Sequence, residues 1–118
     1  MFNEDNLIVK KTIDFSVRIV RLYKFLKETK DENIMSKQLL RSATSIGANV
    51  NEAIYGQSKS DFLSKFSIAL KETSETYYWL LLLNKTDYLT EAQFTSLKND
   101  CDEIFKIITA IVKTTKEN

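Results

Sequence analysis

The 118-residue chain contains no proline and only two glycines, so it has few of the residues that break helices or form tight turns. Hydrophobic residues recur at alternating three- and four-residue intervals along four long stretches. This spacing places them on one face of an α-helix. Because the length also fits one domain, we predict a single all-α domain spanning residues 1–118.

The periodicity predicts four helices, which we place at Asn6–Glu28, at Ile34–Tyr55, at Lys59–Leu83 and from Thr90 onwards. The last of these is expected to fray over residues 113–118. The connections are short, so consecutive helices should run antiparallel in an up-down-up-down four-helix bundle.

Capping residues mark several of the predicted helix ends. Asn6 and Ser58 are suited to accept hydrogen bonds from the first turns that follow them, and Thr90 with Gln93 forms a capping-box pattern. Gly56 is expected to end the second helix in the left-handed conformation. Gly47 lies in the middle of that helix, where it predicts the close approach of a neighbouring helix.

Some hydrophobic residues fall outside the core stripes. In the first helix they lie roughly opposite the stripe, and in the third helix residues 77–83 are apolar on every side. A helix of this kind is normally buried on every side, which one small bundle cannot provide. We therefore predict a homo-oligomer, the alternative being that these residues tuck under loops and termini. The interface candidates are Val9, Ile13, Val20, Arg41, Glu52, Tyr78, Trp79 and Leu82.

The charges are nearly balanced, with a net charge of +1, which gives no global attraction to nucleic acid or to anionic membranes. A local basic side on the first helix is the best candidate for contacting a phosphate backbone. Its candidate residues are Lys11, Arg18, Arg21 and Lys24; an ordinary solvated face is the alternative. In the second helix, Arg41 and Glu52 are either surface charges or fix the register against a neighbouring subunit.

The composition restricts the chemistry. Histidine is absent, which excludes the Ser-His-Asp and Cys-His arrangements, the Glu-x-x-His di-iron motif and zinc sites built from cysteine and histidine. Glu72 and Glu75 lie one turn apart and could hold a metal, but a solvated face or ion pairs is the preferred interpretation. We predict no catalytic, cofactor-binding or metal site, and no small-molecule substrate.

The sequence is also typical of a soluble cytoplasmic protein. Cys101, the only cysteine, is expected to act as a small hydrophobic residue on the inner side of the fourth helix. The N-terminal segment MFNEDNLIVKK lacks the long apolar run of a signal peptide. The most apolar stretch, residues 77–83, is far shorter than the roughly 20 residues that span a membrane.

The segment from Gln38 to Leu83 resembles the four-helix-bundle proteins encoded in intervening sequences of bacterial 23S ribosomal RNA genes. The resemblance lies in residues 41–46 (RSATSI), 49–53 (NVNEA), 60–62 (SDF), 69–72 (ALKE) and 75–76 (ET), followed by the aromatic and leucine-rich stretch. Ala53 departs from the pattern, because some members carry glycine there.

This resemblance implies a left-handed antiparallel bundle that assembles as a homopentamer and has no established enzymatic activity. The chain is also similar to the accessory protein of diversity-generating retroelements, a pentameric bundle that engages nucleic acid and a reverse transcriptase through basic surfaces. We therefore predict a non-enzymatic homo-oligomer that binds RNA or DNA through the first helix. The alternative is a structural or protein-interaction scaffold with a polypeptide partner, and an enzyme using Glu72 and Glu75 with a metal is the least favoured hypothesis.

Overall fold

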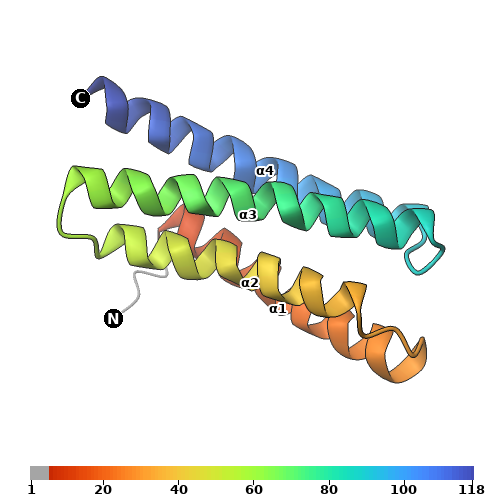
Figure 1. Ribbon diagram of the computed structural model, residues 1–118. Helices are drawn as coiled ribbons and strands as arrows, with labels where there is room; N and C mark the ends of the chain where they lie inside the picture. Colours follow the sequence, from red (N-terminus) through yellow and green to blue (C-terminus); the bar gives the residue numbers. More distant parts are fainter. Residues whose placement is uncertain (1–5) are drawn as a thin grey trace.

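The computed structural model describes residues 6–118, which form four α-helices (Figure 1). The helices are α1 (Leu7–Thr29), α2 (Met35–Ile54), α3 (Lys59–Lys85) and α4 (Glu91–Glu117). Consecutive helices run antiparallel, so the predicted all-α four-helix bundle is confirmed, while its left-handed sense stays a prediction. The first five residues of the N-terminal segment discussed above lie outside the described part of the chain.

Local capping fixes the starts of three helices as predicted. The Asn6 side chain accepts hydrogen bonds from two backbone N–H groups of α1, at 3.1 and 3.4 Å. The Ser58 hydroxyl accepts one from the Asp61 N–H at 3.0 Å, at the start of α3. Thr90 and Gln93 exchange the two hydrogen bonds of a capping box at the start of α4. At the other end of α4 the predicted fraying is wrong, because the helix continues to Glu117.

The start of α2 uses a cap that was not among the predicted ones. The carboxylate of Glu32 is buried and accepts hydrogen bonds from the backbone N–H groups of Ile34, Met35 and Ser36, at 2.9–3.2 Å. The Ser36 hydroxyl donates in return to the Glu32 carbonyl oxygen at 2.8 Å. A negative charge in this position satisfies the free N–H groups of the first turn and complements the helix dipole.

The two glycines have different roles. A Cβ atom on Gly47 would lie 3.3 Å from the Cβ and Oγ1 atoms of Thr12, so the predicted close approach of a neighbouring helix is confirmed, and that helix is α1. The prediction for Gly56 is wrong, since neither glycine has a positive φ among the described residues. Gly56 instead makes room for the Asp61 side chain, because a Cβ atom at position 56 would lie 2.7 Å from a carboxylate oxygen of Asp61.

One hydrophobic core runs along the bundle and takes residues from all four helices. Among its largest fully buried side chains are those of Phe15, Leu39, Phe66 and Ile104. Cys101 is buried with them, as predicted. Helices α2 and α3 pack together most extensively and α1 and α4 least, so the α1–α4 side is the most open seam of the bundle. Within residues 6–118, no helix has the length and apolar character needed to cross a membrane.

Candidate functional site

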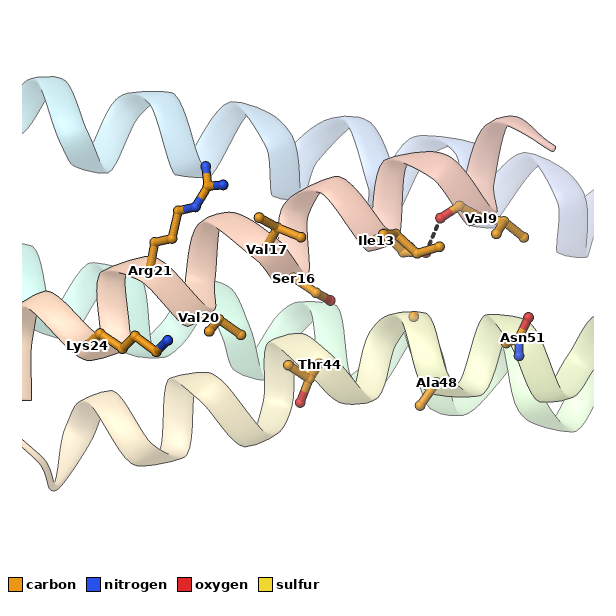
Figure 2. Close-up of a pocket in the computed structure, with 12 residues that line it drawn as sticks. Val9, Ile13, Ser16, Val17, Val20, Arg21, Lys24, Thr44, Ala48 and Asn51 are labelled. Carbon is orange, nitrogen blue, oxygen red and sulfur yellow. Dashed lines mark hydrogen bonds between the residues drawn. The ribbon is translucent and has the colours of Figure 1, made fainter. Parts of the chain in front are cut away.

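A groove of about 640 Å³ lies between α1 and α2 (Figure 2). Its walls are mainly aliphatic on the α1 side, from Ile13, Val17 and Val20, and small on the α2 side, including Gly47 and Ala48. The α1–α2 contact at Gly47 brings the two helices close together, and the small α2 residues leave the groove open above it. Two cationic residues, Arg21 and Lys24, lie at one end of the groove (Figure 2).

The groove presents hydrophobic side chains to solvent. Val17 is 42% exposed and Ile13 is 37% exposed, and Val20 beside them is half-buried. A contiguous apolar surface on a soluble domain usually marks a contact with another molecule. Ile13 and Val20 are among the predicted interface residues, but Val17 is not, although its position four residues after Ile13 places it on the same side of the helix.

The third interface candidate on α1, Val9, is placed differently from the prediction. It is only 3% exposed and belongs to the hydrophobic core, although it also borders the groove. The close contact of α1 with α2 near Thr12 turns this side of α1 toward the neighbouring helix, so that Val9 is covered by its own subunit.

The interface candidates on α3 are only partly covered by the chain itself. Trp79 and Leu82 are half-buried, and the Trp79 indole N–H donates a hydrogen bond to Glu75 at 2.9 Å. Leu80 and Leu83 are fully buried, whereas the other residues of this segment are half-buried or exposed, so the bundle does not enclose it completely. Tyr78 is the most exposed of them, with 55% of its surface accessible, and its contact with another copy stays a prediction.

Arg41 joins α2 to α3 within the subunit. Its guanidinium forms ion pairs with Glu75 and, at 3.4 Å, with Glu72. The ion-pair interpretation of these two carboxylates is therefore confirmed. A carboxylate oxygen of Glu52 lies 3.9 Å from the Lys65 Nζ atom on α3. No group of three or more cysteine, aspartate or glutamate side chains that could hold a metal ion occurs within the described residues.

The predicted nucleic-acid residues fall into two groups. Lys11 and Arg18 point to α4, where they form 2.5 Å ion pairs with Glu103 and Asp100, respectively. The hydrogen bond to Glu103 raises the pKa of Lys11. Arg21 and Lys24 instead line the end of the groove and form no ion pair with any residue between 6 and 118. Among the four candidates, only Arg21 and Lys24 therefore have a positive charge that no neighbouring carboxylate neutralises.

Burial raises the pKa of the Cys101 thiol to about 12. The reactive thiolate should then be about a thousandfold rarer at pH 8 than for a solvent-exposed cysteine. We expect iodoacetamide to modify native Cys101 about a thousandfold more slowly than the same residue in guanidinium chloride. Mass spectrometry of quenched samples measures both rates, and equal rates would contradict the buried position.

Comparisons with known proteins agree with this architecture. A family model described as 23S rRNA-intervening sequence protein matches residues 4–110. The chain is similar to a crystal structure of a protein of unknown function from the S23 ribosomal protein family of Bacteroides thetaiotaomicron. The two share 53% sequence identity and a TM-score of 0.91 over 93% of this chain and 98% of the other. No curated protein matches the sequence.

Proposed function

The chain belongs to the 23S rRNA-intervening sequence protein family, and we propose that it is a non-enzymatic, cytoplasmic scaffold whose copies assemble through the groove between α1 and α2. The observation that carries this proposal is the exposed apolar wall of the groove, formed by Ile13 and Val17. The resemblance noted in the sequence favours five copies.

Burial of these side chains by another copy would stabilise the assembly. Each Å² of apolar surface removed from water contributes about 25 cal/mol, and the fully buried core of an interface is more apolar than the rest of the protein surface. The polar groups that could support a reaction are engaged elsewhere, since Arg41 holds Glu72 and Glu75 in ion pairs. This arrangement supports a structural function rather than metal-assisted or acid–base catalysis.

The test is a charge placed in the groove. We expect Val17→Lys to convert the assembly to monomers, because a buried lysine without a partner opposes association. Size-exclusion chromatography with light scattering measures the mass, and circular dichroism verifies that the helices remain. Ala110→Lys, at an exposed position on α4, is the matched control and should leave the mass unchanged. An unchanged mass for Val17→Lys would contradict the role of the groove.

A second candidate function is binding of RNA or DNA, and the unpaired cations of α1 favour it. Arg21 and Lys24 are followed by Lys27 and Lys30, which also lack an ion pair within the described residues. An assembly repeats this basic surface in every copy, so that its electrostatic field adds up. The proposed phosphate contact is therefore the C-terminal part of α1. The N-terminal part, where Lys11 is already ion-paired, is not included.

Fluorescence anisotropy with a structured RNA at several salt concentrations tests this candidate. We expect Arg21→Gln with Lys24→Gln to weaken binding and to reduce the slope of log affinity against log salt by about 1–2. The matched control, Lys11→Gln with Arg18→Gln, removes the same charge but only from ion-paired residues, and should have the smaller effect. Equal effects, or no binding at low salt, would reject the proposed contact.

A further inference from the structure

Acidic residues of α4 cover the N-terminal part of the basic side of α1. The guanidinium of Arg18 donates one hydrogen bond to the Asp100 carboxylate at 2.5 Å and another to the Ser96 hydroxyl at 2.9 Å. About two helical turns earlier, the Lys11 Nζ atom lies 2.5 Å from a carboxylate oxygen of Glu103. Both carboxylates are more than 80 residues away in the sequence from the cations that they contact.

The charges around these contacts cancel. A pocket of about 260 Å³ lies between α1 and α4 at this position. The charged residues that line it are three cations and three carboxylates, namely Lys10, Lys11, Arg18, Asp14, Asp100 and Glu103. The third pair, Lys10 with Asp14, closes within α1 at 2.9 Å. This part of α1 therefore contains cations but presents no net positive charge to a ligand.

The two ion pairs between α1 and α4 are open to solvent. The side chains of Lys11 and Arg18 are 35% and 42% exposed, and those of Glu103 and Asp100 are 50% and 35% exposed. The pairs also lie along the most open seam of the bundle, where α1 and α4 pack least. Exposed ion pairs contribute little to stability. Another anion can therefore reach these cations and replace the carboxylates without disturbing the core.

The contacts of Arg18 resemble those that a phosphate group would make. A guanidinium binds two oxygen atoms side by side, and it does so with phosphates as well as with carboxylates. Here the Asp100 carboxylate and the Ser96 hydroxyl supply the two oxygen atoms. The ammonium group of Lys11 binds one oxyanion, which Glu103 provides. The two carboxylates of α4 thus occupy positions on α1 that phosphate oxygens would also fit.

The covered cations continue the basic surface on the C-terminal part of α1. Arg21 follows Arg18 by three residues, so the two side chains are neighbours on the helix. From Lys11 to Lys24 the helix rises by about 20 Å. A nucleic-acid backbone that runs along α1 would meet these cations in succession once the carboxylates are displaced. Until then, the carboxylates repel it.

We propose that Asp100 and Glu103 act as internal competitors of nucleic-acid phosphate. They keep Lys11 and Arg18 as a latent extension of the basic surface on the C-terminal part of α1. This inference rests on the proposed binding of RNA or DNA and concerns the regulation of that binding. A phosphate gains either contact only by displacing a carboxylate, which lowers the affinity and limits the number of phosphates that the chain neutralises.

Removal of the two carboxylate charges tests this proposal. The variant Asp100→Asn/Glu103→Gln, which we call the uncovered variant, retains the size of both side chains but releases Lys11 and Arg18 from their ion pairs. The probe is a fluorescein-labelled RNA hairpin, whose anisotropy is measured at several salt concentrations. We expect tighter binding than for the wild type at low salt. The slope of log affinity against log salt should be steeper by about 1–2, because two further phosphates are neutralised.

Two further variants show whether the released cations cause the effect. Asp102→Asn/Glu117→Gln also removes one aspartate and one glutamate charge from α4, but Asp102 pairs with Lys98 of its own helix and Glu117 is exposed at the helix end. This control should change the affinity and the slope much less. Adding Lys11→Gln and Arg18→Gln to the uncovered variant should return the slope to the wild-type value. Circular dichroism verifies that the helices remain in every variant.

The outcomes separate this inference from the proposed function. If the wild type binds and the uncovered variant has the same affinity and slope, the competition is overturned and the basic surface of α1 remains the contact. An equal gain in the Asp102→Asn/Glu117→Gln control would also overturn the competition, because net charge alone would explain it. Binding by the uncovered variant but not by the wild type would support the competition and overturn the proposed contact at the C-terminal part of α1. Absence of binding by both proteins at low salt would overturn both.

Discussion

Replacing Glu32 with alanine is expected to lower the free energy of unfolding by about 2–3 kcal/mol. The substitution removes a buried carboxylate that accepts hydrogen bonds from three consecutive residues at the start of α2. Those N–H groups would lose their charged acceptor, and the first turn of α2 would be left without a side-chain cap. Urea unfolding followed by circular dichroism measures the change.

Glu28→Ala is the matched control for this prediction. Glu28 is an exposed glutamate in the last turn of α1, where a negative charge is not favoured by the helix dipole. Its removal should change stability by less than about 0.5 kcal/mol. Equal effects for the two variants would show that the buried carboxylate does not stabilise the hairpin.

Replacing Phe66 with alanine is expected to destabilise the fold by about 3–5 kcal/mol. Phe66 is fully buried in the core, and its ring centroid lies 4.7 Å from that of Phe62. The substitution leaves a cavity between helices and removes this aromatic contact. Because domains of this size are stable by roughly 5–15 kcal/mol, the variant should unfold at much lower urea concentration.

The control for the core prediction is Phe25→Ala. Phe25 is 40% exposed and does not line the groove between α1 and α2. Its loss should therefore have a small effect on unfolding at equal protein concentration. The comparison must hold concentration fixed, since self-association adds to apparent stability. A Phe66 variant as stable as the Phe25 variant would contradict the described core.

The helices and most of their ends could be predicted because they depend on local rules. Hydrophobic spacing defines the core stripes, and the caps at Asn6, Ser58 and Thr90 act on residues at most three positions away. The cap of α2 could not be predicted in this way. Glu32 lies three residues before the first residue of α2, farther from the helix than a usual N-cap residue. Its carboxylate reaches the first turn because the chain turns at Asp31, which has a φ of 53°.

The candidate site was harder to predict, because it depends on contacts between helices. Lys11 and Arg18 have the same local pattern as Arg21 and Lys24, yet only the first two meet acidic residues of α4. Val9 has the same type of side chain as Val17, yet it is buried by the close approach of α2. A single sequence contains no direct signal for which helices are adjacent, so these differences emerge only in the folded bundle.

The groove connects the fold to the proposed function. Gly47 is a poor helix former, but it permits the α1–α2 contact below the groove and keeps the α2 wall small. The exposed valine and isoleucine side chains on the opposite wall gain little within a single subunit. Their burial against another copy gives both features a common physical explanation.

Sedimentation equilibrium of the unmodified protein over a wide concentration range tests the central claim of self-association most directly. The proposed assembly predicts a species with a whole-number multiple of the 13.7 kDa chain mass, and the resemblance to pentameric bundles favours five. A single 13.7 kDa species at every concentration would contradict it.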